Sequence, residues 1–367
     1  MTIANQAMIR EINRRTVLET VIFHPSISRA ALTDQTNLTG GTITAIVQQL
    51  LDEQLLEEVG TVGGGKGRRR LLLQLKADSA CCIAVTVGKE QFRLMLCDLG
   101  GTPLQRAHSP AVYDSFSAFL DTLVSFVDPY LNTDYPLGVG AVVLAVEGTI
   151  TEEELSIGGL SCSRQALRTK LQDAWGTPVW MEHVSRLSAL GENAYAMKCQ
   201  NMAYLHAENT MGLGLIVEGK LFCGRYGRAC NISQMRLWPD GPFSETASVP
   251  ALLARYGFSS FASFQTAFRE ETPQAMETAH DFLQFYTLLL ENIFLLYDTE
   301  RLVIHCPFTS MGDLLFLQLK NRLGPFKSRL YRSFLQEDAP LCGGAVLGIC
   351  QFLNIQTFAP SKGYGVL

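Results

Sequence analysis

The sequence has no apolar run of about 18 or more uncharged residues, the length that a membrane-spanning helix needs. Its first residues also lack the charged, apolar and small-residue regions of a secretory signal peptide. These two absences predict a cytoplasmic protein without membrane insertion. Low-complexity segments and short repeats are not evident either, so neither gives a guide to the fold.

The cysteines show no C-x-x-C spacing, the usual signature of a redox or zinc pair. They are dispersed, and most have apolar neighbours in the sequence. In a reducing compartment this pattern favours buried thiols over disulfides or a metal site. The ten positions are Cys81, Cys82, Cys97, Cys162, Cys199, Cys223, Cys230, Cys306, Cys342 and Cys350.

Length and charge indicate more than one domain. A chain of 367 residues with 47% hydrophobic content can build two or three cores. The formal net charge is -5, but residues 1–76 hold nine Lys/Arg against seven Asp/Glu, a local +2 that leaves -7 for the remainder. Such a division suits a DNA-binding head on an acidic body.

Residues 28–51 have the pattern of a helix-turn-helix. Ser28 can cap a helix over residues 29–35, residues 36–38 make a turn, and Thr39 can cap a second helix. Apolar residues recur at helical spacing in that second helix, and residues 9–23 supply a supporting helix. The apolar positions of the second helix are Ile43, Ile46, Val47, Leu50 and Leu51.

The other face of the second helix is small and polar, which would let it enter a major groove. Gly40 and Gly41 would expose the first-turn amides to a phosphate. Cations nearby would contact the backbone of the duplex. The expected DNA-binding residues of this part of the chain are Arg14, Arg15, Arg29, Thr39, Gly40, Gly41, Thr42, Thr44 and Gln48.

A glycine-rich turn at residues 63–67 joins two alternating segments and predicts a wing. Its cations are Lys66, Arg68, Arg69 and Arg70, which could lie along phosphates or enter a narrow minor groove. Alone, such a run could equally be a solvated turn. Next to a helix-turn-helix pattern it favours DNA binding.

The rest of the chain alternates between strand and helix patterns, which predicts two α/β lobes. We expect a winged helix-turn-helix domain at residues 1–77, a first lobe at 78–190 and a second at 191–367. The clearest segments are strands at residues 81–87, 92–98, 137–146, 202–206, 212–217 and 302–306, and helices at 115–130 and 278–296.

This order of segments resembles the ROK family, named for repressors, open reading frames and sugar kinases. The most specific part is residues 212–235, where G-x-G-x-x-x-x-G-K-L is followed by G-x-x-G. The resemblance covers nearly the whole chain. It implies a two-lobed actin-like ATPase (ribonuclease H-like) fold with a ligand cleft between the lobes.

The chain departs from the kinases of that family at two catalytic positions. Their D-x-G-G-T phosphate loop corresponds to residues 86–90, where Thr86 replaces the carboxylate and Glu90 would repel a phosphate. Their catalytic Asp corresponds to Val184, which cannot accept a proton. His183 could substitute as a base, but a structural or ligand-facing role is favoured. These departures from the kinase pattern therefore predict no enzyme activity and no cofactor.

The family's zinc site is also incomplete. Its histidine corresponds to Gln234, and the cysteine segment that supplies the other ligands is missing. No structural zinc is expected. Cys223 and Cys230 would form a packed pair, with a two-thiol zinc remnant as the alternative.

Polar residues at the family's sugar-binding positions could still bind a ligand. Three ligand hypotheses remain open: a sugar or sugar phosphate, another small molecule, or a cleft without a ligand that serves packing or protein contact. The expected ligand-binding residues are Glu182, His183, Asn231, Gln234 and Glu245.

The leading hypothesis is a sequence-specific transcription regulator, a repressor of carbohydrate genes, that binds a double-stranded DNA operator as a homodimer or tetramer. An effector would alter lobe closure and so the spacing of the two heads. The alternatives are a ligand-independent interaction module that docks a membrane transporter or signalling protein, and a sugar kinase.

Overall fold

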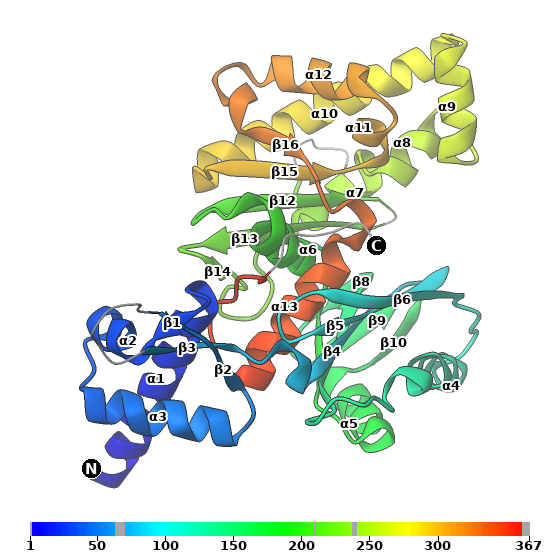
Figure 1. Ribbon diagram of the computed structural model, residues 1–367. Coiled ribbons are helices and arrows are strands. Elements are labelled where there is room, and N and C mark those ends of the chain that lie inside the picture. Colours follow the sequence, from blue (N-terminus) through cyan, green and yellow to red (C-terminus); the bar gives the residue numbers. More distant parts are fainter. Residues whose placement is uncertain (1, 63–69, 209, 237–240, 362–367) are drawn as a thin grey trace.

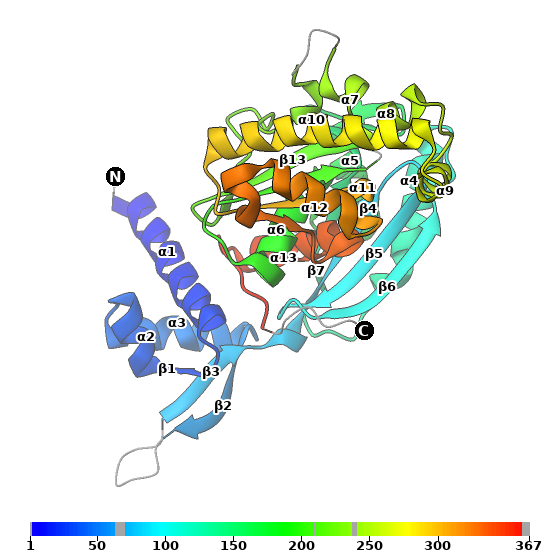
Figure 2. The same cartoon turned by 90° about the horizontal axis from the view of Figure 1, so that it is seen from above.

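The computed structural model describes residues 2–62, 70–208, 210–236 and 241–361 (Figure 1). A small N-terminal head lies beside a larger body of two α/β lobes, each built on its own sheet (Figures 1 and 2). The expected α/β class is confirmed. Within the described ranges, no helix is both long and apolar enough to cross a membrane.

The head is a winged helix-turn-helix. The hydroxyl of Ser28 accepts a hydrogen bond from the Ala31 amide at 3.3 Å, and that of Thr39 accepts one from Thr42 at 3.2 Å. Both predicted N-caps are thus confirmed. The elements are α1 (Thr2–Phe23), β1 (Ile27–Ser28), α2 (Arg29–Thr36), α3 (Gly40–Asp52), β2 (Leu56–Val62) and β3 (Arg70–Leu75).

One buried cluster holds the head together. Leu32 of α2 packs with Ile43, Val47 and Leu50 of α3, and Leu73 of the central strand β3 closes the cluster. These are the apolar positions that the helical spacing predicts for α3. The predicted tip of the wing, with Lys66, Arg68 and Arg69, lies outside the described residues.

The two lobes repeat one topology. In each described five-stranded sheet, the first strand in chain order lies at the centre, the second and third pair antiparallel on one side, and the fourth and fifth pair parallel on the other. The first sheet has β4 (Cys81–Val87), β5 (Gln91–Asp98), β6 (Pro103–Pro110), β7 (Val139–Val146) and β11 (Val179–His183). The second has β12 (Met202–Ala207), β13 (Met211–Val217), β14 (Lys220–Leu221), β15 (Arg301–His305) and β16 (Leu330–Arg332).

Helices cover the outer face of each sheet. In the first lobe α4 (Phe116–Val127) and α5 (Arg164–Trp175) share a buried cluster with β4 and β7. In the second, α10 (Pro273–Tyr297) and α12 (Asp313–Arg322) do the same with β12 and β15 (Figure 1). Smaller elements complete the lobes: β8 (Gly148–Ile150), β9 (Glu154–Ile157), β10 (Leu160–Ser163), α7 (Phe243–Thr246), α8 (Val249–Arg255), α9 (Phe261–Arg269) and α11 (Pro307–Ser310).

A pair of helices joins the lobes. α6 (Val184–Glu192) packs against β12 and β13 of the second sheet, whereas α13 (Ala339–Leu353) returns to pack against β4 and β7 of the first. The boundary expected at residue 190 therefore falls inside α6, and α13 does not belong with the rest of the expected second lobe. The sequence pattern cannot show this exchange, because it identifies helices but not the sheets that they cover.

Glycine makes this helix pair possible. A Cβ built on Gly343 of α13 would lie 1.7 Å from the carbonyl oxygen of Leu187 in α6. On the facing helix, a Cβ on Gly191 would lie 2.3 Å from the carbonyl oxygen of Ala339. Only glycine lets the two backbones approach this closely.

The head is fastened to the end of α13. Asn354, which ends that helix, donates to the Glu11 carboxylate at 2.6 Å, and the amides of Gln356 and Thr357 donate to Glu19 Oε1 at 2.7 and 3.1 Å. Apolar residues of the head belong to the same buried cluster as Leu353 of α13. α1 is thus in direct contact with the helix that joins the two lobes (Figure 1).

Candidate DNA-binding surface and interlobe cleft

The outer face of α3 is open to solvent. Gly41, Thr44, Ala45 and Gln48 are exposed along one side of the helix, as are Thr39 and Gly40 at its start. Thr42 is half-buried, and its hydroxyl lies 2.9 Å from that of Thr39, so it serves the cap as well as the surface. The Gln48 amide donates to Asp52 at 2.9 Å, a contact within the same exposed helix. This face has the shape and polarity of a recognition helix.

The arginines of the head differ in what they contact. Arg14 was expected to face DNA, but it pairs with Glu53 at 2.8 Å and donates to the Leu353 carbonyl at 3.3 Å. The first contact lies within the head and the second joins the head to the end of α13. Arg29 pairs with Glu58 at 3.0 Å on the surface of the head. Arg15 is half-buried on α1, and Arg70 begins β3.

A cavity of about 620 Å³ lies between the lobes. The first lobe lines it with Thr86, Glu90 and Glu147, and Val184 at the start of α6 also faces it. The second lobe contributes His206, Glu208 and His305. This cleft is where the family resemblance places the nucleotide, and the substituted positions 86, 90 and 184 do line it.

Acidic side chains outnumber cationic ones in the described lining of this cleft. Four carboxylates line it, those of Glu90, Glu147, Glu208 and Glu337, and one of its two cations, Arg93, is already bound to Asp338 at 2.7 Å. Burial, reinforced by the nearby charge of Glu208, raises the pKa of Glu147 to about 7. Glu90, which we expect to repel a phosphate, is among the carboxylates of this lining.

The shifted pKa of Glu147 predicts a pH-dependent effect on stability. Because its folded-state pKa lies above its ordinary value of 4.5, the ionised carboxylate penalises the fold above pH 7, and the penalty fades as pH falls toward 4.5. Glu147→Gln should raise the free energy of unfolding by up to about 3 kcal/mol at pH 8 and by little at pH 4.5. Thermal unfolding at the two pH values measures this. The exposed control Glu153→Gln should show neither gain, and an equal gain for Glu147→Gln at both pH values would contradict the assignment.

A second cavity of about 300 Å³ adjoins the first at Gly148 and Thr149. His183 and Asn231 line it, so the structure brings together two of the five expected ligand-binding residues. Glu182 instead pairs with Arg186 at 2.9 Å. Gln234 and Glu245 are exposed and absent from the described lining of either cavity. The expected convergence of five polar groups is therefore corrected to His183 and Asn231.

His183 has a capping role at the start of α6. Its Nδ1 accepts a hydrogen bond from the Ser185 amide at 3.2 Å and lies 2.7 Å from the Ser185 hydroxyl. Burial lowers its pKa to about 4, and the charge of Arg186 adds to this shift. The backbone of Gly212 in β13 lies close to the ring, since a Cβ there would come within 2.6 Å of His183 Cε1. An imidazole with its lone pair engaged in this way is a poor general base, as the sequence argument favours.

Arg186 is a residue of this cavity that the sequence did not single out. It is 7% exposed, and besides Glu182 it donates to the carbonyl oxygens of Gly227 at 2.5 Å and Ala229 at 3.1 Å. These bonds hold the loop before Asn231 against α6. The G-x-x-G spacing at residues 224–227 and the A-x-x-I spacing at residues 229–232 were the signals of this loop in the sequence.

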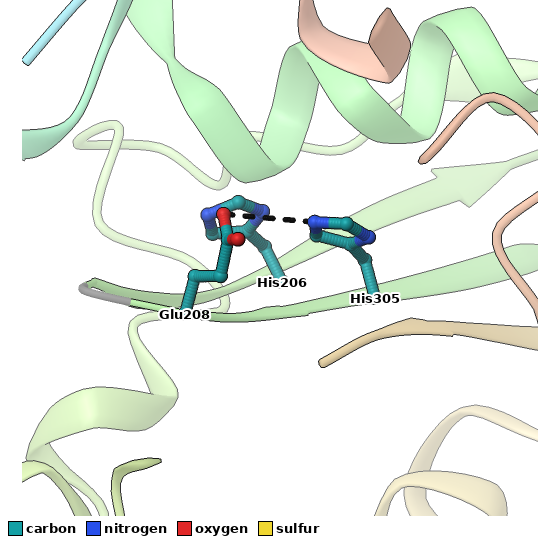
Figure 3. Close-up of side chains that lie close together, drawn as sticks. All are labelled: His206, Glu208 and His305. Carbon is teal, nitrogen blue, oxygen red and sulfur yellow. Dashed lines mark ion pairs between the residues drawn. The ribbon is translucent and has the colours of Figure 1, made fainter. Parts of the chain in front are cut away.

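Three further residues missed by the sequence lie together on the second lobe. His206 and His305 stand side by side on β12 and β15, and Glu208 follows at the end of β12 (Figure 3). Burial lowers the pKa of His206 to about 3, and the neighbouring His305 contributes to this shift. Interaction with His305 lowers the pKa of Glu208 despite its burial.

The cysteines behave as the sequence predicts. All ten are free thiols, and all are buried except the half-buried Cys162, Cys223 and Cys230. Burial raises the pKa of Cys230, and the nearby thiol of Cys223 is among the groups that act on it. Raised pKa values keep these thiols protonated and unreactive.

The model of the ROK family matches residues 82–341, which is more than half of the chain. The chain belongs to the ROK family. Among curated relatives, the xylose repressor of Bacillus spizizenii is 25% identical over 248 residues, covering 66% of this chain and 65% of the repressor. The matched region thus spans just under two thirds of that relative's length.

Solved structures of ROK proteins show the same fold. A ROK transcriptional regulator described as a homologue of the E. coli MLC protein superimposes with a TM-score of 0.78 at 20% identity, covering 94% of this chain and 96% of that one. A ROK glucokinase from Streptomyces griseus, in complex with glucose and AMPPNP, gives a TM-score of 0.62 at 18% identity, covering 73% and 98%. Because the regulator matches 94% of this chain, the match must include most of the head. The 73% of this chain that the glucokinase matches is a portion the size of the body.

Proposed function

We propose that this ROK protein is a sequence-specific DNA-binding transcription regulator, a repressor of carbohydrate genes, with a catalytically inactive body that binds a sugar-type ligand. The observation that carries the proposal is the exposed face of α3 in a winged helix-turn-helix fastened to the helix that joins the lobes. The name of the xylose repressor supports the same function. Because its target is the chromosome, the protein would act in the cytoplasm.

Selection of bound fragments from sheared genomic DNA tests the DNA-binding part. A homodimer would select paired half-sites whose centres are about 34 to 36 Å apart, one helical turn, or a multiple of that distance. Analytical ultracentrifugation of the protein with a selected duplex would give the number of chains bound. Recovery of unrelated fragments with no common sequence would contradict sequence-specific binding.

The smaller cavity is the proposed effector site. Its described lining combines a histidine and an asparagine with Arg186 and backbone groups, and its size is at the lower end of ligand cavities. Such groups can satisfy the fixed donors and acceptors of a monosaccharide or its phosphate. Thermal unfolding with a panel of pentoses, hexoses and their phosphates should reveal a ligand that raises the midpoint, and the same ligand should weaken operator binding.

The route from cleft to head gives a sharper prediction. Ser185 and Arg186 of α6 line the smaller cavity, and α6 packs along α13. The segment just after α13 donates from Gln356 and Thr357 to Glu19 of α1. Glu19→Ala should preserve operator binding but reduce the effector-induced change in affinity, from about tenfold or more to less than about threefold. Glu19→Gln keeps an acceptor oxygen and serves as the matched control. Operator titrations with and without effector measure both, and an unchanged effector response in Glu19→Ala would contradict this route.

The fold of the body also matches a glucokinase, so sugar kinase activity is the second candidate. Val184 at the position of the base and the carboxylates of the cleft oppose it. Incubation with ATP, magnesium and a panel of hexoses should give no sugar-dependent ADP. Steady ADP release with any sugar would overturn the proposal of an inactive body.

A further inference from the structure

His206, Glu208 and His305 form a compact group on one lobe. His206 and His305 are register partners on the parallel strands β12 and β15, so both side chains leave the same face of the sheet. Their rings stack with centroids 5.6 Å apart and planes 25° from parallel. Glu208 Oε2 lies 3.6 Å from His305 Nε2, and one ligand atom from each of the three residues lies within 4.8 Å of the others (Figure 3).

Three of the four imidazole nitrogens of this group have no hydrogen bond to the described residues, although His305 Nε2 lies 3.6 Å from Glu208. His206 is 5% exposed and His305 6% exposed, yet Nδ1 of His206 and both ring nitrogens of His305 have no hydrogen bond. Buried polar atoms are normally paired, because leaving one unsatisfied costs about 1 to 3 kcal/mol. Two adjacent histidines with this deficit therefore point to a missing ligand.

We propose that His206, Glu208 and His305 bind a divalent transition metal ion of the Zn²⁺ type. Two imidazoles and one carboxylate suit first-row metals such as zinc and cobalt, whereas Mg²⁺ and Ca²⁺ prefer oxygen ligands alone. The three ligand atoms need only close to about 3.4 Å from one another to reach the usual metal–ligand distances of about 2.1 Å. Rotation of the partly exposed Glu208 side chain can provide much of this movement.

This site differs from the zinc site implied by the family resemblance. All three ligands come from the second lobe, outside the segment of residues 230–245 that lacks the zinc-binding residues. A fourth coordination position would remain open toward the cavity between the lobes, where a water or a ligand oxygen can bind. The inference does not depend on DNA binding, so it can hold or fail independently of the proposed function.

Titration of chelator-treated full-length protein with Co²⁺, followed by visible absorption, tests the site. Wild type should bind one Co²⁺ per chain with the d–d bands of a low-symmetry nitrogen and oxygen site, and Zn²⁺ should displace it because zinc binds more tightly. Glu208→Gln and His305→Gln should each weaken Co²⁺ binding at least tenfold. Glu208 lies at the end of a strand with a side chain 39% exposed, so its variant should fold, and circular dichroism checks this.

Two controls separate this site from other metal ligands. His280→Gln removes an exposed imidazole of α10, and the double variant Cys223→Ser/Cys230→Ser removes the thiols near the lost zinc segment. Both should bind Co²⁺ as wild type does. The proposal is overturned if wild type shows no saturable Co²⁺ binding, if Glu208→Gln and His305→Gln bind as wild type does, or if only the cysteine variant loses the bands.

Discussion

Gly343→Ala is expected to destabilise the protein by about 3 kcal/mol or more in the free energy of unfolding. The new methyl group would meet the carbonyl oxygen of Leu187 at 1.7 Å, and both atoms belong to the helices that join the lobes. This steric clash can be relieved only if α13 moves away from α6. That movement would also disturb the packing of α13 on β4 and β7. Urea and thermal unfolding measure the loss.

Gly40→Ala is the matched control for this substitution. A methyl group added at Gly40 would have no atom within 4 Å, and the backbone conformation there is open to other residues, so alanine should be neutral or slightly stabilising. If Gly343→Ala unfolds at the same urea concentration and temperature as wild type, the backbones of α6 and α13 cannot approach each other this closely.

The double variant Ala45→Glu/Gln48→Glu is expected to lose operator affinity by about 100-fold or more. Both positions are exposed on the face of α3 assigned to the major groove, where two carboxylates would face the phosphates of the duplex. Juxtaposed like charges cost several kcal/mol, and about 2.7 kcal/mol already corresponds to 100-fold. Fluorescence anisotropy with a selected duplex measures the affinity.

A control places a carboxylate far from the face of α3. Gln105→Glu adds a carboxylate at an exposed position of β6 on the body and should leave operator affinity within about twofold. Thermal unfolding of Gln105→Glu should be unchanged, because the side chain is exposed. The double variant should lose only about 0.5 kcal/mol, since Gln48→Glu replaces an exposed hydrogen bond to Asp52 with a like-charge pair. Wild-type affinity in the double variant would mean that another surface contacts DNA.

The head could be predicted from sequence almost to the residue, since its signals are local. Ser28 and Thr39 cap the helices as expected, and the apolar positions of α3 fill the core. The start of α1 is the exception, because the helix begins at Thr2 and the apolar stripe suggested Ile9. Helix propensity continues the helix beyond the residues that packing requires.

The site could be predicted only in part, because it depends on contacts between distant segments. Thr86, Glu90 and Val184 were found through the family pattern, and they do line the cleft. His206 and His305 lie far apart in the sequence with no motif between them, and only the pairing of β12 with β15 unites them. The contacts of Arg14 with Glu53 and with the Leu353 carbonyl could not be predicted either, because they depend on how α1 packs on α3 and on the end of α13.

The proposed function requires that the head on this kinase-type body recognise one DNA sequence. The most direct test is the dissociation constant of the purified protein for a selected duplex and for a scrambled duplex of equal length, at one stated salt concentration. A sequence-specific regulator should bind the selected duplex about 1,000-fold or more tighter than the scrambled one. Equal affinity for the two duplexes, with ATP hydrolysed in the presence of a sugar, would contradict it.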